Sequence, residues 1–341
     1  MNRHYVFSSL TRICPLPELA FRVHPISKEE WATGDYVVCE ISAPPSGIRH
    51  IELIDGREMP VMQGDMIVGA LGKRRATLEA TGTWTKVGED MKMHVLTRAG
   101  LFGKLGSKSP FTSTLIQIKY RGHVYVDGKK AVMRGCVKKV PSRKFTTPVI
   151  LMVGTSMSAG KTTSARTIVR ELGNGGLKVL GAKLAGAGRY RDILGMADAG
   201  ADYILDFVDV GLPSTIHPIE DYRVALGELL SMMALKQADV AVVEIGSSPL
   251  EPYNGDVAIE AIRKNIACTV LCASDPYAVL GVMNAFKMDP TFVTGPATNT
   301  SAGIELIKNL CGVPALNLID PESIPSLRQI LSSKIMGYSS D

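Results

Sequence analysis

The sequence predicts two domains of different classes: a small β domain followed by a doubly wound, mostly parallel α/β domain. Up to about residue 140, short runs of β-branched or alternating residues are separated by Gly, Pro and Asp, which is typical of antiparallel strands. After Pro148, predicted strands and helices alternate for about 190 residues, which is typical of a parallel sheet covered by helices. We therefore divide the chain into residues 1–146 and residues 147–341.

The composition is that of an ordinary globular protein. The chain has 341 residues, of which 45% are hydrophobic and 21% are charged, enough for two buried cores. No run approaches the roughly 18 apolar residues of a membrane span, and the start lacks the apolar core of a secretory signal. The six cysteines are scattered and indicate no disulfide framework. We therefore expect a reduced, cytoplasmic setting without membrane association.

The charge is distributed unevenly. Residues 1–150 carry 23 Lys and Arg against 13 Asp and Glu, whereas residues 151–341 carry 15 against 20. The excess lies between Leu101 and Ile150, where eleven basic residues accompany one acid, Asp127. This pattern is compatible with a solvated face or with a surface for an anion such as nucleic acid. No nucleic-acid recognition motif accompanies the charge, so a nucleic-acid partner is possible but not favoured.

The β domain is predicted to be a small antiparallel barrel or sandwich, because its strands recur about every ten residues. Asp127-Gly128 is a good two-residue hairpin turn. The stretch Ala99–Pro110, rich in Gly, Lys and Ser, predicts a mobile loop, and Lys138–Pro148 predicts the linker. Six segments predict strands: "DYVVCEI", "DMIVGAL", "ATLEATGTW", "KMHVLTR", "STLIQIKY" and "HVYVDGKKAVMRG".

The second domain begins with a strand that lacks alternation, "VILMVG", as expected for a strand buried on both faces. The further segments alternate in type. Strands are predicted in "KVLGAKLAG", "ADVAVVEIG", "IACTVLCAS", "PTFVTG" and "PALNLI", and helices in "TTSARTIVRELGNGG", "DYRVALGELLSMMALKQ", "GDVAIEAIRKN" and "SAGIELIKNLCG".

The stretch "GTSMSAGKTT" has the strand before it and the helix after it that a phosphate-binding loop requires. Glycines let backbone N–H groups surround an anion, and the helix N-terminus adds its dipole. Lys161 is expected to reach the β- and γ-phosphates, and the Thr162 hydroxyl to ligate Mg²⁺. The predicted nucleotide-binding residues are contiguous: Gly154, Thr155, Ser156, Met157, Ser158, Ala159, Gly160, Lys161, Thr162 and Thr163.

The spacing of this loop differs from the usual Gly-x-x-x-x-Gly-Lys-Ser/Thr template, because five residues separate Gly154 from Gly160. In this it resembles the loop of dethiobiotin synthetase and its relatives, which belong to the SIMIBI division of P-loop NTPases. The resemblance covers roughly residues 147–320 and implies further site residues: Lys183 after the second strand, Asp192 or Asp198 as an acidic Mg²⁺ ligand, and Glu244 after the third strand.

The match departs from that family in the loop, where Ser156 replaces an aspartate, and at Lys183-Leu184, where the family has Lys-Pro. The β domain has no counterpart in it. The segment "GADYILDFVDVGLPST" resembles uncharacterised P-loop proteins of the same division. The guanine-reading pattern Asn-Lys-x-Asp is absent, and "TGPATNTS", which contains Asn299, is a candidate base pocket. These features favour ATP over GTP.

Several residues are interpreted one by one. Glu244 ends an apolar strand, where an unpaired buried acid would be costly, so we expect it to serve the metal or the catalysis. The segment "LDFVDVG" alternates between apolar and polar residues, so Asp206 and Asp209 are expected to point in different directions. Cys268 and Cys272 lie about 13 Å apart on one strand face, which is too far for one metal ion, so we expect core residues. Substrate-contacting residues are predicted at four positions: Arg189, Arg191, Asp209 and Ser247.

The leading functional hypothesis is a homodimeric Mg²⁺-ATP-dependent enzyme that transfers the γ-phosphoryl group to a small acidic substrate, as a kinase or as the first half of a ligation. Lys161, Lys183 and Glu244 are the predicted catalytic residues, and Thr162, Asp192 and Glu244 the predicted metal ligands. One alternative is a nucleic-acid- or partner-handling ATPase, including a polynucleotide 5′-hydroxyl kinase, that uses the basic β domain. Another is a group transferase that keeps the fold without hydrolysing nucleotide.

Overall fold

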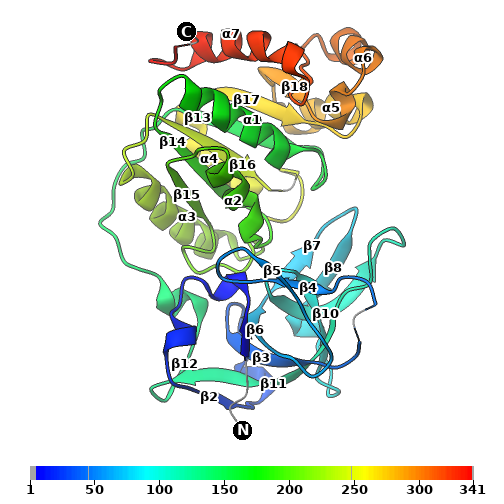
Figure 1. Cartoon of the computed structure of the whole chain (residues 1–341), viewed down its shortest axis with the longest axis vertical. Coiled ribbons are helices and arrows are strands. Elements are labelled where there is room, and N and C mark those ends of the chain that lie inside the picture. The colour runs from blue at the N-terminus through cyan, green and yellow to red at the C-terminus, as the bar shows by residue number, and fades with distance from the viewer. Residues whose placement is uncertain (1–4, 45, 247, 340–341) are drawn as a thin grey trace. The chain divides into compact units, whose positions relative to one another are not determined.

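The computed structural model describes residues 5–44, 46–246 and 248–339, and it divides into two compact units (Figure 1). Unit 1 contains the chain up to Lys139 together with the segments Ala187–Arg191 and Phe207–His217. Unit 2 contains the rest: 140–186, 192–206 and the chain from Pro218 onward. Two short segments of the second half of the chain thus belong to the first unit, which a single boundary in the sequence does not express.

Unit 1 is built on a mostly antiparallel sheet. The described strands of this sheet are β1 (Tyr5–Phe7), β2 (Phe21–His24), β3 (Tyr36–Ile41), β6 (Met66–Leu71), β7 (Lys73–Arg75), β8 (Ala80–Thr83), β9 (Lys92–Thr97), β10 (Leu101–Lys108), β11 (Gln117–Val126) and β12 (Lys129–Lys130). The order is β1-β6-β3-β11-β9-β10-β8-β7, and a further parallel pairing of β10 with β6 closes a ring. Strands β4 (His50–Glu52) and β5 (Glu58–Pro60) form a separate hairpin. The predicted β domain is confirmed, and the ring makes it a barrel.

The glycine-rich stretch Ala99–Pro110 is not the mobile loop that its composition predicted, because most of it forms strand β10. A Cβ on Gly103 would lie only 2.8 Å from the backbone of Thr83 and Trp84, so glycine is needed where β10 crosses close to its neighbour. Glycine here reflects close packing of strands and not a flexible chain.

The predicted hairpin turn is confirmed. Asp127 and Gly128 have φ values of 48° and 75°, and the strands on either side pair in antiparallel register. Both positive φ values are those of a turn whose twist matches the flanking strands.

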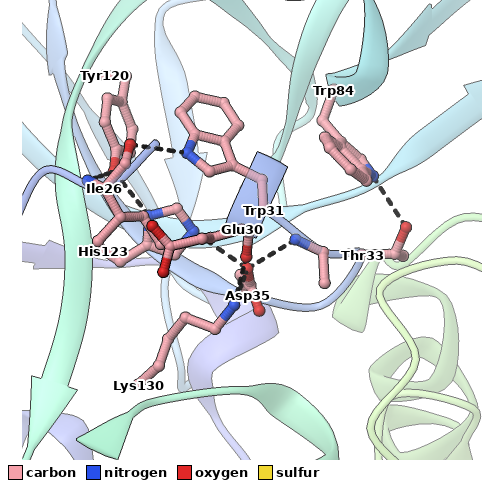
Figure 2. A network of polar contacts seen from close by, with 10 residues as sticks. Ile26, Glu30, Trp31, Thr33, Asp35, Trp84, Tyr120, His123 and Lys130 are labelled. Carbon is pink, nitrogen blue, oxygen red and sulfur yellow. Dashed lines mark hydrogen bonds and ion pairs between the residues drawn. The ribbon is translucent and has the colours of Figure 1, made fainter. Parts of the chain in front are cut away.

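A polar network is buried inside unit 1 (Figure 2). His123, which is fully buried, lies 3.1 Å from the Asp35 carboxylate through Nε2 and 2.7 Å from the Tyr120 hydroxyl through Nδ1. Lys130 Nζ also donates to Asp35, at 2.8 Å. Burial raises the pKa of Asp35, but the bonds from His123 and Lys130 outweigh it and leave that pKa below its usual value. The Trp31 ring lies 4.5 Å from the Tyr120 ring and covers the network.

Cys14 and Cys136 form a disulfide that links positions 122 residues apart within unit 1. Such a bond typically stabilises a fold by about 2–4 kcal/mol, since it restricts the unfolded chain. The scattered cysteines did not predict it, because spacing alone carries no signal over such a separation. Cys268 and Cys272 are confirmed as buried core residues on one face of their strand.

Unit 2 contains a six-stranded, all-parallel sheet, which confirms the predicted α/β fold. Its described strands are β13 (Val149–Gly154), β14 (Val179–Ala185), β15 (Tyr203–Asp206), β16 (Val240–Ile245), β17 (Ile266–Cys272) and β18 (Phe292–Thr294), in the order β15-β14-β16-β13-β17-β18. After β13 the chain forms β14, β15 and β16, which lie toward one edge of the sheet, and then β17 and β18, which lie toward the other edge. The crevice at the carboxyl end of β13 is therefore where a doubly wound sheet binds its ligand.

Helices cover this sheet. The described α-helices are α1 (Lys161–Asn174), α2 (Tyr190–Asp198), α3 (Ile219–Ala234), α4 (Gly255–Ile262), α5 (Pro276–Phe286), α6 (Ser301–Cys311) and α7 (Ile324–Lys334). Residues of α1, α2 and α7 share one apolar core with alternate residues of the strands. No helix among the described residues is both long and apolar enough to cross a membrane.

The predicted last strand, "PALNLI", is wrong: the segment makes one isolated bridge, between Val293 and Ala315, and then runs as a loop to α7. The apolar run instead places Leu318 in the core that α1 and α7 share.

Candidate functional site

The loop after the central strand β13 has the geometry of a phosphate-binding loop. Every residue of β13 is buried, and the strand pairs with β16 on one side and β17 on the other. Gly160 has a φ of 90°, a value that favours glycine, and it immediately precedes the first residue of α1. The N-terminus of a 14-residue helix therefore points into the loop, with its unpaired N–H groups available to an anion.

Lys161 lies within this loop and not in solvent. Its side chain is buried, and Nζ donates a hydrogen bond of 2.6 Å to the backbone oxygen of Ser156. A Cβ on Gly154 would lie 2.6 Å from that Nζ and 2.9 Å from Cδ, so only glycine leaves room for the lysine. Burial disfavours the ammonium and lowers the pKa of Lys161, although the Glu244 carboxylate opposes that shift.

Three charged residues lie side by side where neighbouring strands end. In the register of the sheet, Lys183 of β14 is paired with Asp206 of β15 on one side and with Glu244 of β16 on the other. All three side chains are almost fully buried. Asp192, in the first turn of α2, accepts a hydrogen bond of 2.5 Å from Lys183 Nζ. The parallel sheet thus brings together residues that are distant in sequence.

The buried charges around Lys183 shift one another's pKa values. Burial alone would lower the pKa of Lys183, but Asp192, Glu244 and Asp206 outweigh it, so that pKa is raised and the ammonium is retained. Burial and the nearby Asp192 raise the pKa of Glu244, against the opposing effect of Lys183 and Lys161. A buried carboxylate with a raised pKa is a competent proton acceptor.

Two glycines make room for the Lys183 side chain. A Cβ on Gly246 would lie 2.5 Å from Lys183 Cε, and one on Gly186 would lie 3.1 Å from it. Gly246 directly follows β16. No local pattern predicts a need for these two glycines, because their contact with Lys183 exists only in the folded sheet.

The donor atoms suit a magnesium–nucleotide complex. The Thr162 hydroxyl lies 3.4 Å from Glu244 Oε2, and the Asp192 carboxylate is close enough to Glu244 to influence its pKa. Mg²⁺ takes oxygen ligands and usually needs one or two carboxylates besides phosphate oxygens and water. No group of three His, Cys, Asp or Glu side chains able to hold a metal occurs in the described ranges.

A cavity of about 260 Å³ lies directly beside the loop. Gly160, Ser164, Asn299 and Asn317 are among the residues that line it. Gly295 has a φ of 97°, and a Cβ there would lie 2.4 Å from the backbone oxygen of Ala159, so glycine allows this segment to approach the loop. Asn299, the residue predicted for the base pocket, lines this cavity, and its role there stays a prediction. Asn317 was missed, because the sequence assigned it to a strand.

The remaining predicted residues are Asp198, Arg189, Arg191, Asp209 and Ser247. Asp198 is exposed at the end of α2, so Asp192, and not Asp198, neighbours Lys183. Arg189, Arg191 and Asp209 belong to unit 1, where Asp209 accepts a hydrogen bond of 3.2 Å from Arg12.

The backbone N–H of Arg191 binds Glu52, and its side chain is largely exposed. Ser247 lies outside the described residues. The substrate roles of these residues remain predictions.

No protein-family model matches the chain, and no curated protein matches it. Among solved structures, it is similar to chloroplast FtsY from Physcomitrella patens, with 15% identity and a TM-score of 0.37, over 52% of this chain and 61% of the other. HypB from Helicobacter pylori in complex with nickel gives 16% identity and 0.36, over 57% and 92%. A ParA family ATPase from Chlorobium tepidum gives 14% and 0.32, over 55% and 92%. The chain thus spans about three fifths of the length of the FtsY chain.

At these identities and TM-scores the likeness concerns the general fold alone. The chain's own geometry carries the assignment of the loop: a parallel central strand, a glycine-rich turn, and a helix whose first residues are Lys161 and Thr162. Unit 2 is a P-loop domain.

Proposed function

We propose that unit 2 binds Mg²⁺-ATP at the loop around Lys161 and transfers the γ-phosphoryl group to a small acidic substrate. The observation that carries the proposal is the convergence of two buried lysines and two carboxylates on the phosphate loop: Lys161, Lys183, Asp192 and Glu244. Phosphoryl transfer needs positioning and charge stabilisation, and buried cations supply both.

Each residue has a distinct role in this proposal. The N–H groups at the start of α1 hold the phosphates, and Lys161 exchanges its bond with the Ser156 oxygen for a phosphate oxygen. Lys183 stabilises the charge that develops on the transferred group. Glu244 accepts the proton when the attacking group is a hydroxyl, whereas an attacking carboxylate carries no proton and needs no base; in both cases the new O–P bond replaces the bond to the leaving ADP. Bound Mg²⁺, held by Thr162 and one or both carboxylates, would neutralise phosphate charge.

The cavity beside the loop supports ATP as the nucleotide. Asn299 and Asn317 each offer an amide donor and an acceptor, which suits the edge of a purine base such as adenine. The absence of Asn-Lys-x-Asp from the sequence agrees with this choice.

The second candidate, an ATPase that handles nucleic acid, is not favoured by the basic segment of unit 1. Several of its cations already have acidic partners: Lys104 with Asp90, Arg121 with Glu40, and Lys130 with Asp35. Lys108 donates to two backbone oxygens. Charges that are paired within the protein contribute less to binding a phosphate backbone.

The test combines binding and turnover. Calorimetry should show Mg²⁺-dependent ATP binding that Lys161→Ala abolishes while circular dichroism and the melting temperature stay unchanged, with Lys308→Ala on the exposed surface of α6 as the matched control. Phosphate release from ATP, measured with and without a panel of small dicarboxylates, separates a transferase from a simple hydrolase. Equal ATP affinity in Lys161→Ala and in the parent protein would contradict the proposal. Binding without any turnover would instead favour the group-transferase alternative.

A further inference from the structure

A second cavity, of about 340 Å³, lies along the exposed side of α1, farther from the phosphate loop than the first. Thr163, Arg166, Thr167 and Arg170 supply its helical wall. These residues are at positions i, i+3, i+4 and i+7, so they form one stripe on the helix surface. The chain before α7 and the first residue of that helix supply the opposite, apolar wall, with Leu318 and Ile324 among its residues.

The two arginines of this cavity have no partner in the part of the chain that the structure describes. Among residues 5–44, 46–246 and 248–339, neither Arg166 nor Arg170 forms a hydrogen bond or an ion pair. The carboxylate that lines the same cavity, Glu171, is already engaged, since it accepts a hydrogen bond of 2.7 Å from Arg328. The cavity therefore presents two uncompensated guanidinium groups, which favour a phosphate because their planar forks match its oxygens.

The two cavities adjoin each other. Both are lined by Thr163, Leu318 and Ile319, and the first cavity begins at Gly160 of the phosphate loop. Arg166 and Arg170 lie about 4.5 and 10.5 Å beyond Thr163 along the helix axis, at about 1.5 Å of rise per residue. A ligand with its 5′-phosphates at the loop and its base in the first cavity would place its ribose close to Thr163. A further anionic group on that ribose would then face the arginines.

We propose that this second cavity binds a phosphate carried on the ribose of the nucleotide, so that the site takes a ribose-phosphorylated nucleotide in preference to the plain one. The 2′ and 3′ positions are two sources of the same chemistry, and the experiment distinguishes them. The inference rests on nucleotide binding at the phosphate loop and adds a specificity that the loop alone does not supply.

The experiment uses the full chain and three probes: ADP, ADP with an additional 3′-phosphate, and ADP with an additional 2′-phosphate. We expect one of the phosphorylated probes to bind about tenfold or more tightly than ADP in calorimetry at fixed ionic strength. Arg166→Gln/Arg170→Gln should remove that gain and leave the affinity for ADP unchanged. Arg223→Gln/Arg263→Gln is the matched control, because it removes two exposed arginines from α3 and the end of α4 and should keep the gain.

The outcomes separate this inference from the proposed function. If ADP binds and neither ribose phosphate increases the affinity, the inference is wrong and the nucleotide site stands. The same conclusion follows if the gain survives in Arg166→Gln/Arg170→Gln. If no probe binds to the parent protein at all, the proposed function fails and the inference fails with it.

Discussion

Replacement of Lys183 by Met tests the charge balance of the candidate site. The substitution keeps the length of the side chain and removes its charge. Asp206 and Glu244 would remain beside it with almost no solvent exposure, and Asp192 would lose its 2.5 Å hydrogen bond. The variant therefore leaves a cluster of carboxylates without the buried cation that lies among them.

The expected cost follows from that geometry. The direct attraction of two unit charges 2.5 Å apart is about 6–7 kcal/mol at an effective dielectric constant of about 20. The gain from no longer burying the ammonium offsets part of it, and removal of one partner of a buried pair costs about 3–5 kcal/mol in practice. Since Asp192 keeps 20% of its side-chain exposure, we expect the lower end, about 3 kcal/mol. For a unit of about 200 residues this lowers the melting temperature by roughly 6–12 °C.

The assay is urea and thermal unfolding of Lys183→Met, with Lys308→Met on the exposed surface of α6 as the control. Lys183→Met/Glu244→Gln should recover part of the loss.

The pH dependence of the stability of Lys183→Met has a defined sign. Because the pKa of Glu244 is raised in the folded protein, the folded state binds more protons than the unfolded one between the two pKa values, and stability increases as the pH falls through that interval. Lys183 holds the pKa of Glu244 down, so its removal raises that pKa further, and the deficit of Lys183→Met should be smaller at pH 5 than at pH 8. A loss below about 1 kcal/mol, the level of an ordinary surface change, would refute the reasoning.

Three further predictions concern activity and the β domain. Glu244→Gln should bind nucleotide nearly as well as the parent protein while turnover falls by about 10²-fold or more, and unchanged turnover would assign Glu244 a purely structural role. Gly154→Ala should weaken nucleotide binding, because its Cβ would lie 2.6 Å from the Nζ of the loop lysine, and calorimetry would disprove this if the affinity were unchanged. Charge reversal at Lys104, Lys108 and Lys129 should leave ATP turnover unaltered, whether or not RNA is present. The nucleic-acid alternative would be favoured if RNA stimulated the turnover of the parent protein several-fold at physiological salt and the variant lost this stimulation.

Features that depend on local patterns could be predicted from the sequence. The loop around Lys161 was predicted because its phosphate-binding residues are contiguous, and because the hydrophobic residues of the flanking strand and helix follow recognisable patterns. The hairpin at Asp127 was predicted for the same reason. Predictions from local composition were wrong where the same composition fits two structures. The glycines of Ala99–Pro110 favoured a loop, but Gly103 is needed because two strands cross closely there. The "PALNLI" segment failed similarly, because a short apolar run packs equally well as a strand or as an irregular chain.

How the site residues combine could not be predicted, because it depends on the folded sheet. Lys183, Asp206 and Glu244 lie far apart in the chain, and the register of parallel strands alone makes them neighbours. The choice of Asp192 over Asp198 depends on which face of α2 meets Lys183. Gly246 and Gly186 are needed because a lysine side chain passes over them. These relations depend on packing between segments distant in sequence, which no local pattern records, whereas a turn or a phosphate loop carries its own geometry in a few adjacent residues.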